Sequence, residues 1–157
     1  MVKFNIDDIL AMAEQIERNG QKHYRKFATL AKDPKVKDLF NQLADWEAVH
    51  ERTFSTLRAQ FAADNLQGVF DPSGDSELYL QAMADRHIFA GDTEVEAETE
   101  LELIELALKF ETDTILFFVG MKQIVPAKLG KEKIEVLIEE ELRHVAFLRK
   151  HMALLSA

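Results

Sequence analysis

The sequence predicts an all-α fold, a four-helix bundle with a long crossover connection that contains a short extra helix. One observation is an internal repeat, in which a glutamate is followed 30 residues later by Glu-x-x-His. The two copies lie 94 residues apart without a gap and consist of Glu17, Glu47 and His50, and of Glu111, Glu141 and His144. A second observation is that each of these residues lies on an apolar series with helical spacing. The third is a stretch rich in Gly and Pro between the copies, which interrupts the helical pattern. Together these observations predict two similar helical hairpins joined by a connection.

Length and composition indicate a single domain over residues 1–157. The chain has 157 residues, of which 47% are hydrophobic, which is enough to bury one sizeable core. We expect helical hairpins at residues 5–63 and 99–155 and a crossover at residues 64–98.

Charge and cysteine content exclude several classes of function. The formal net charge is −9 and no basic cluster stands out, which argues against nucleic acid or an anionic membrane as a partner. Without cysteine the chain has no disulfide, thiolate metal site, iron–sulfur cluster or cysteine nucleophile. Its first residues lack the apolar core of a signal peptide and its densest apolar run, Ile115 to Val119, is too short to span a bilayer. We therefore expect a cytoplasmic protein that does not insert into a membrane.

The first hairpin is defined by its cap residues. Asn5 or Asp7 can cap a helix that runs to about Ala31. Asp33-Pro34 is typical of an N-cap followed by proline in the first turn, so a second helix is expected to begin at once and to run to about Ala63. At helical rise, Glu17 and Glu47 lie about 24 Å and about 21 Å from this turn, which places them at similar depth.

The crossover and the second hairpin follow from the same kinds of signal. Between residues 65 and 92 a short helix is expected from about Ser76 to Phe89, and its apolar segment from Leu78 to Met83 either contacts a second copy of the chain or covers the bundle. Thr99-Glu-Leu-Glu102 is a capping-box pattern for the third helix, which should end near Val125-Pro126. The fourth helix should start between Gly130 and Glu132 and continue nearly to the C-terminus.

The repeated glutamates and histidines are the candidate site residues. A single Glu-x-x-His pattern is usually a solvated surface pair, but here both copies interrupt apolar stripes. Buried ionisable groups cost several kcal/mol unless they are paired, hydrogen-bonded or bound to a metal. Carboxylates with imidazoles suit Fe, Mn or Zn, and a site without thiolates is not expected to select Cu(I). The alternative is a bundle in which the Glu and His side chains satisfy one another without metal.

The chain resembles the rubrerythrin-like branch of the ferritin-like superfamily over nearly its whole length. The resemblance is carried by Glu17-x-x-Gly20-x-x-His23-Tyr24, Glu47-x-x-His50, Glu111-Thr-Asp-Thr-Ile-Leu-Phe-Phe and Glu141-x-x-His144. It implies a ferritin-like bundle with two Fe ions per chain, Mn or Zn being possible. It also implies that Glu47 and Glu141 bridge the metals, that Glu17 and Glu111 are terminal ligands, and that His50 and His144 each bind one ion. Tyr24 would act as a hydrogen-bond donor or electron relay beside the ligands.

The resemblance implies a non-haem di-iron oxidoreductase that oxidises Fe(II) with O2 or H2O2, of ferroxidase or peroxidase type, in peroxide detoxification or iron handling. Full-length rubrerythrins carry a four-cysteine iron domain that this chain lacks, so an external electron donor such as a rubredoxin-like protein is expected. They also carry an extra glutamate where this chain has Thr114, which brings the ligand set closer to that of bacterioferritins. The resemblance further suggests a homodimer or larger homo-oligomer.

Two alternative functions remain open. One is a non-enzymatic metal-binding protein for iron storage, sensing or delivery, possibly loaded with Mn or Zn. The other, hydroxylation of an organic substrate, is weaker, because the 11 phenylalanines are expected to fill the room that such a substrate needs. His23, His87 and His151 are not expected to be ligands.

Overall fold

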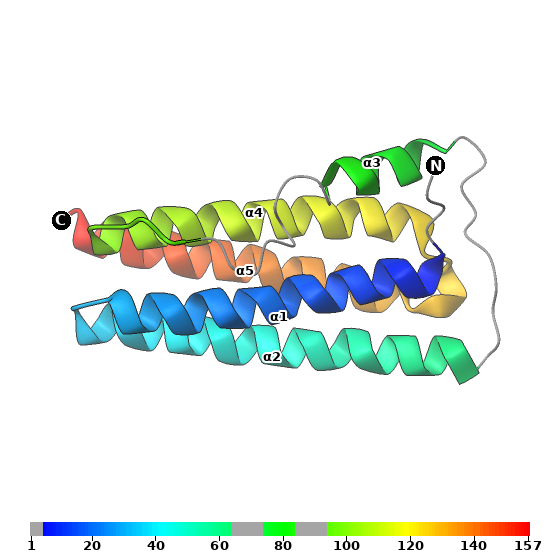
Figure 1. Ribbon diagram of the computed structural model, residues 1–157, viewed down its shortest axis with the longest axis horizontal. Helices are drawn as coiled ribbons and strands as arrows, with labels where there is room; N and C mark the ends of the chain where they lie inside the picture. The colour runs from blue at the N-terminus through cyan, green and yellow to red at the C-terminus, as the bar shows by residue number, and fades with distance from the viewer. Residues whose placement is uncertain (1–4, 64–73, 84–93) are drawn as a thin grey trace.

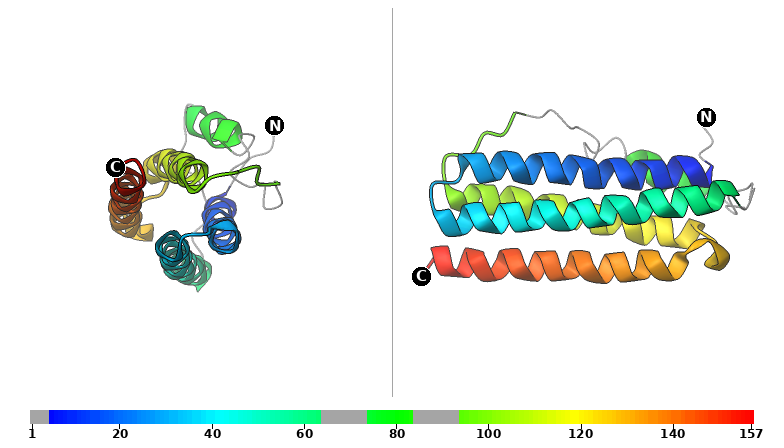
Figure 2. Two further views of the ribbon diagram at one scale, coloured as in Figure 1. Left: turned by 90° about the vertical axis from the view of Figure 1, so that its left-hand side faces the viewer. Right: turned by 90° about the horizontal axis from the view of Figure 1, so that it is seen from below.

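The computed structural model describes residues 5–63, 74–83 and 94–157. All regular secondary structure in these residues is helical. Four long helices lie side by side, and one short helix lies outside them against α4 (Figures 1 and 2). The helices are α1 (Ile6–Leu30), α2 (Pro34–Ala63), α3 (Asp75–Met83), α4 (Glu100–Ile124), the 3-10 turn η2 (Ala127–Leu129) and α5 (Lys131–Leu155). The described residues contain no strand, and the predicted all-α bundle is confirmed.

The order of the helices requires a crossover between the two hairpins. α1 packs against α2, and α4 packs against α5. α2 and α4 begin at the same end of the bundle, so the chain between them has to return along the bundle's length (Figure 1). This is the long connection that the sequence predicts. In the described part of the chain no helix is both long and apolar enough to cross a membrane.

The predicted caps account for where the long helices start. Asn5 and Asp8 form a capping box, in which each backbone N–H donates to the other residue's side chain at 2.9 Å. Thr99 and Glu102 form the second box, with both hydrogen bonds at 3.2 Å. Asp7, the other predicted cap, lies in the first turn of α1. Gly130 precedes α5 with φ of 98°, a left-handed conformation that favours glycine.

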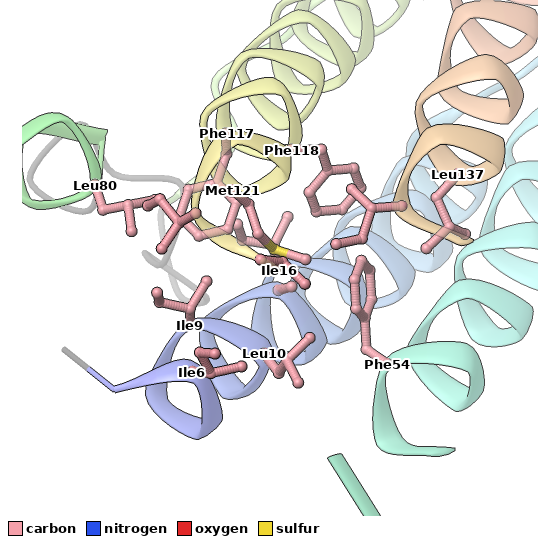
Figure 3. Packing of buried hydrophobic residues seen from close by; sticks show 14 of the residues in the cluster. Ile6, Ile9, Leu10, Ile16, Phe54, Leu80, Phe117, Phe118, Met121 and Leu137 are labelled. Atoms are coloured by element: carbon pink, nitrogen blue, oxygen red, sulfur yellow. The ribbon is translucent and has the colours of Figure 1, made fainter. Parts of the chain in front are cut away.

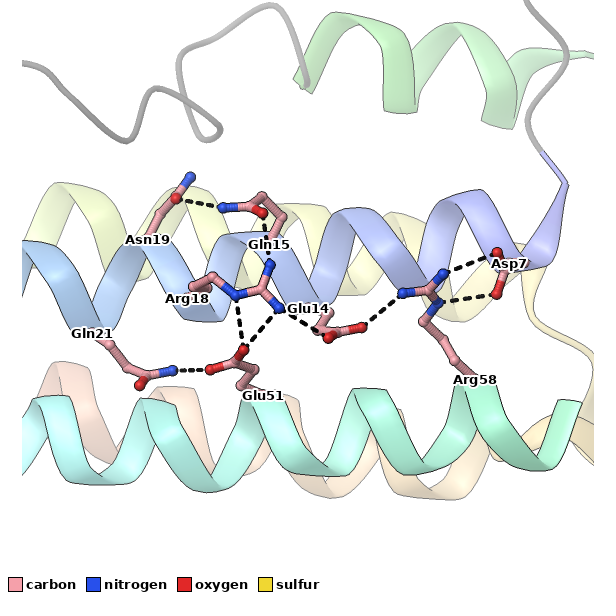
Figure 4. Close-up of polar contacts among 8 residues, drawn as sticks. All are labelled: Asp7, Glu14, Gln15, Arg18, Asn19, Gln21, Glu51 and Arg58. Atoms are coloured by element: carbon pink, nitrogen blue, oxygen red, sulfur yellow. Dashed lines mark hydrogen bonds and ion pairs between the residues drawn. The ribbon is translucent and has the colours of Figure 1, made fainter. Parts of the chain in front are cut away.

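Charged side chains join α1 and α2 along their outer face (Figure 4). The Arg58 guanidinium donates to both carboxylate oxygens of Asp7, at 3.0 and 3.1 Å, and to Glu14 at 2.9 Å. Arg18 donates to Glu14 at 3.0 Å and to Glu51 at 2.9 Å. A single exposed ion pair contributes little to the stability of a fold. A connected network that includes a bidentate arginine contributes more, and it fixes the register of the two helices.

Two apolar clusters fill the bundle, one toward each end. The first contains the start of α1 and the end of α4, with Phe54, Phe118 and Met121 among its members (Figure 3). The second contains the end of α1 and the start of α2, with Phe27 and Phe40. Each long helix carries a buried glutamate, and two of them also a buried histidine, between the two clusters. Apolar packing at both ends of the bundle therefore holds these polar side chains in position.

The short helix α3 covers the bundle of its own chain. Leu80 and Met83 are buried in the first apolar cluster, whereas Leu78 is 59% exposed. The Tyr79 hydroxyl donates to the backbone carbonyl of Leu116 in α4. Of the two roles that the sequence allows for this segment, the structure supports the cover. The helix begins at Asp75, close to the predicted start, and the predicted residues 84–89 lie outside the described part.

Replacing Gly120 by alanine should destabilise the attachment of α3. A Cβ on Gly120 would overlap the Tyr79 ring, so the ring would have to leave its place on α4. We expect a loss of about 1–3 kcal/mol in the free energy of unfolding, measured by urea titration. In a Tyr79→Ala background the same substitution should cost much less, because the ring is gone. Equal costs in both backgrounds would contradict this packing.

Candidate metal centre

The side chains of all six residues singled out by the repeat meet in the middle of the bundle, and none of these residues is more than 4% exposed. They come from all four long helices: Glu17 from α1, Glu47 and His50 from α2, Glu111 from α4, and Glu141 and His144 from α5. The three-residue spacing of each Glu-x-x-His pair places both side chains on one helix face. The predicted convergence of these residues is what the structure shows.

Glu47 and Glu141 occupy the centre of the cluster, because each lies near both imidazoles. The two Glu141 oxygens lie 2.7 Å from Nδ1 of His50 and 2.9 Å from Nδ1 of His144. The two Glu47 oxygens lie 3.7 and 3.2 Å from the same two nitrogens. One donor atom from each of these four residues falls within 4.8 Å of the others, the spacing of a shared metal site.

Glu17 and Glu111 lie on opposite sides of this centre, and each approaches one imidazole. A Glu17 oxygen lies 3.7 Å from Nδ1 of His50, and a Glu111 oxygen lies 3.6 Å from Nδ1 of His144. The cluster therefore has a central pair of carboxylates and two flanks, each made of one glutamate and one histidine. This division offers two cation positions that share the central carboxylates.

Most polar atoms of the cluster have no hydrogen-bond partner. Buried atoms without one include both oxygens of Glu17 and of Glu141 and the Nδ1 atoms of His50 and His144. The short N···O approaches above therefore lack the angle of a hydrogen bond. Buried polar atoms without partners are costly, and a divalent cation between oxygen and imidazole donors would satisfy them. The donor set suits Fe, Mn or Zn.

The four carboxyl groups differ in pKa according to their place in the cluster. Burial, together with the charges of Glu47 and Glu141, raises the pKa of Glu17 and of Glu111 well above the ordinary value. Burial also raises the pKa of the central pair, but the contact of Glu17 with Glu47 and the contacts of both imidazoles with Glu47 and Glu141 outweigh burial and leave both values lowered. Burial lowers the pKa of the histidines, yet the surrounding carboxylates raise that of His144 to about 12 and also raise that of His50.

Metal binding should therefore release protons and strengthen as pH rises. A group with a raised pKa holds its proton to higher pH, so Glu17, Glu111, His50 and His144 each have to release a proton before they can act as ligands. We expect a positive number of protons to be released as divalent ions bind, with affinity increasing as pH rises. Calorimetric titration with Zn(II) in buffers of different ionisation enthalpy measures this number. Affinity that falls as pH rises would contradict this proton inventory.

Tyr24 lies against one flank of the cluster. Its side chain is fully buried in α1, and its hydroxyl donates to an oxygen of Glu111 at 2.5 Å. Burial and the charge of Glu111 raise the pKa of this phenol well above the ordinary value, so it keeps its proton. The repeat places Phe118 at the equivalent position, which has no hydroxyl. The two flanks therefore differ in hydrogen bonding.

Two further residues contact the imidazoles and were missed in the sequence. An oxygen of Glu140 lies 2.9 Å from Nε2 of His50, the nitrogen that faces away from the cluster. The Trp46 ring stacks on His144, with ring centres 5.0 Å apart and planes 12° apart. Trp46 and Glu140 are also separated by 94 residues, so they are equivalent positions of the repeat. This equivalence is the one feature of the sequence that could have indicated both residues, although it does not show which contact each of them makes.

Replacing Glu140 by glutamine should weaken metal binding without removing a ligand. A carboxylate on Nε2 orients the ring and increases the basicity of Nδ1. We expect affinity for divalent metal to fall about 10-fold to 100-fold, measured by competition with a chromophoric chelator. The matched control is Glu139→Gln, because Glu139 is exposed and pairs only weakly with Arg143, at 3.9 Å. Equal affinities in the two variants would contradict a role for Glu140.

The remaining candidates lie away from the cluster or have no ligand role in it. The His23 ring packs against Phe110, and His151 contacts the ring and backbone carbonyl of Phe147. His87 lies outside the described residues. Thr114 is buried one turn after Glu111, and its hydroxyl has no hydrogen-bond partner.

Gly20 allows α1 to approach the candidate metal centre closely. A Cβ at this position would lie 3.2 Å from Cγ of Glu47 and 3.1 Å from the ring of Phe110. A larger residue would therefore press on the stem of a central carboxylate. This contact gives a physical reason for glycine in the Glu17-x-x-Gly20 segment.

Comparisons with known proteins agree with this geometry. The family model described as Rubrerythrin matches residues 8–152. A crystal structure from Thermotoga maritima, described as that of a ferritin-like diiron-carboxylate protein, aligns with a TM-score of 0.66 and 21% sequence identity. The alignment covers 98% of this chain and 97% of that one, and at this identity it shows the fold. A comparison with curated protein sequences finds no significant match.

Proposed function

Since the chain belongs to the rubrerythrin family, we propose that it is a non-haem di-iron oxidoreductase that oxidises Fe(II) with O2 or H2O2, in peroxide detoxification or iron handling. The observation that carries this proposal is the division of the four buried glutamates around two imidazoles. In the proposed site, Glu17 and His50 would hold one iron, Glu111 and His144 would hold the other, and Glu47 and Glu141 would contribute to both. Two Fe(II) ions, when bound, supply the two electrons that reduce one molecule of peroxide.

Charge balance supports two divalent ions in this interior. Four carboxylates and two neutral imidazoles offset two divalent cations, so the loaded site carries no large net charge into the apolar bundle. The apolar clusters above and below the site keep water away from it at the two ends of the bundle. The Tyr24 hydroxyl oxygen lies 2.5 Å from an oxygen of Glu111 and donates a hydrogen bond that stabilises the ionised form of this carboxyl group.

Two further parts of the proposal concern reduction and assembly. The chain has no cysteine and thus no thiolate iron site of its own, so repeated turnover requires an external electron donor such as a rubredoxin-like protein. We also propose a homodimer or larger homo-oligomer, which sedimentation analysis would test. Thr114, in place of the additional glutamate of full-length rubrerythrins, favours ferroxidase turnover over strong peroxidase turnover.

The proposed function is tested by rapid mixing of the Fe(II)-loaded chain with O2 or with H2O2. Rapid formation of Fe(III) at two equivalents per chain, faster with one oxidant, would support an oxidoreductase and identify its substrate. Repeated peroxide consumption with a supplied reductant would support peroxidase turnover. Bound iron that is not oxidised faster than free Fe(II), or a chain that retains only Zn or Mn, would overturn the enzymatic proposal in favour of a metal-binding protein.

A further inference from the structure

A groove opens between α2 and α5 on the outer side of the two histidines. Its volume is about 500 Å³. The edges of His50 and His144 form part of its wall, and Trp46, Val49, Ala146 and Phe147 contribute apolar surface. The sequence led us to expect that phenylalanines would leave no such room. Most of the buried ones instead lie in the two end clusters, and the α2–α5 side beside the histidines stays open.

The groove is too large for the proposed oxidants alone. A water molecule occupies about 30 Å³ of liquid, and H2O2 and O2 are of similar scale. Binding sites for organic ligands typically have volumes of about 300–1,000 Å³ and are mostly apolar, with a few polar groups that orient the ligand. The size and lining of this groove fall in that class.

The apolar wall is aromatic and held in place by stacking. The Trp46 ring is nearly parallel to that of His144, which in turn stacks on His50 with centres 5.2 Å and planes 11° apart. Phe147 meets Trp46 edge to face, with centres 5.1 Å apart. Rings fixed in this way form a preorganised surface for a flat apolar group.

The charged residues of the groove favour an anion. Of its charged side chains, Glu140 is engaged with His50, which leaves Arg143 and Lys150 to face a ligand. Within the described part of the chain, Arg143 pairs only with the Glu139 carboxylate, at 3.9 Å, and Lys150 forms no ion pair. We infer that this groove binds a small organic acid, with an aromatic or other apolar body against Trp46 and Phe147 and a carboxylate near Arg143 and Lys150. The inference concerns binding and holds whether or not the metal centre is redox-active.

The single tryptophan of the chain makes the test direct, because Trp46 is itself part of the groove. The full chain, with its metals as purified, is titrated with 4-phenylbutyrate, with the neutral 4-phenyl-1-butanol and with butyrate, which lacks the ring. We expect saturable changes in tryptophan emission with 4-phenylbutyrate and clearly weaker binding of the other two. No change in emission with any probe, or equal binding of the acid and the alcohol, would overturn the inference.

Charge variants identify the binding surface. Arg143→Gln and Lys150→Gln should each weaken 4-phenylbutyrate binding about threefold, and the double variant about tenfold, because each exposed charge pair contributes only modestly to binding. Binding of 4-phenyl-1-butanol should not change. The control is Lys109→Gln, an exposed lysine on α4 that should leave both affinities unchanged. Both substituted groove residues are exposed, so the variants should fold, which circular dichroism checks. A double variant that binds the acid like the unmodified chain would overturn the assignment.

Discussion

Replacing Glu141 by alanine should abolish the binding of both metal ions, and Fe(II) oxidation with it. Glu141 approaches both imidazoles more closely than any other carboxylate of the cluster does, at 2.7 and 2.9 Å. Its removal takes one ligand from each proposed cation position and leaves two imidazoles without their nearest counter-charge. Since losing a residue that only orients a ligand costs about 10-fold to 100-fold in affinity, losing a shared ligand should cost more. Metal content by mass spectrometry after dialysis measures the effect.

Two other variants serve as comparisons for the metal content of the Glu141→Ala protein. Glu17→Ala should remove one metal per chain and retain the other, because Glu17 approaches only His50. The exposed neighbour variant Glu139→Ala should retain both. If the Glu141→Ala protein kept two metals per chain, the central role of this carboxylate would be wrong.

Removing the metals should lower the stability of the whole bundle. The metal-free cluster buries ionisable groups with many polar atoms lacking hydrogen-bond partners, whereas the loaded cluster satisfies them. A ligand that binds only the folded state, at 1,000 times its Kd, stabilises that state by about 4 kcal/mol. For a chain of this size each kcal/mol corresponds to a shift of about 2–4 °C in Tm. Differential scanning calorimetry with and without Zn(II) should therefore show a shift of about 8–16 °C for each occupied position.

The control for this second prediction is the Glu141→Ala protein, whose Tm should be nearly the same with and without Zn(II). Identical Tm values for the unmodified chain in both conditions would mean that the buried Glu and His groups satisfy one another without metal. This is the alternative that the sequence left open.

The bundle and the convergence of the six residues could be predicted because local signals agree with one another. Capping boxes at Asn5 and Thr99 define two helix starts, and the tight turn at Asp33-Pro34 forces an antiparallel hairpin. Within a hairpin, the fixed rise of a helix determines how far each residue lies from the turn, so Glu17 and Glu47 lie at similar distances from it. The repeat then extended the same arrangement to Glu111 and Glu141.

Features that depend on the spacing between α2 and α5 could not be predicted. Glu140 and Trp46 each precede a Glu-x-x-His pair, and on a single helix they lie beside the apolar stripe, in positions typical of surface residues. Their contacts cross from one hairpin to the other, to His50 and His144. Sequence periodicity describes one helix at a time, so it contains no measure of how far two non-consecutive helices stand apart. The groove between α2 and α5 escaped prediction for the same reason.

Anaerobic titration of the metal-free chain with Fe(II) tests the central claim most directly, with free iron measured at each step by a chelator. The claim is that the central carboxylates and the two flanks together bind two ions. We predict a break at two Fe(II) per chain in the unmodified protein, at one in Glu17→Ala and in Glu111→Ala, and none in Glu141→Ala. A break at one ion per chain in the unmodified protein, or no break at all, would contradict it.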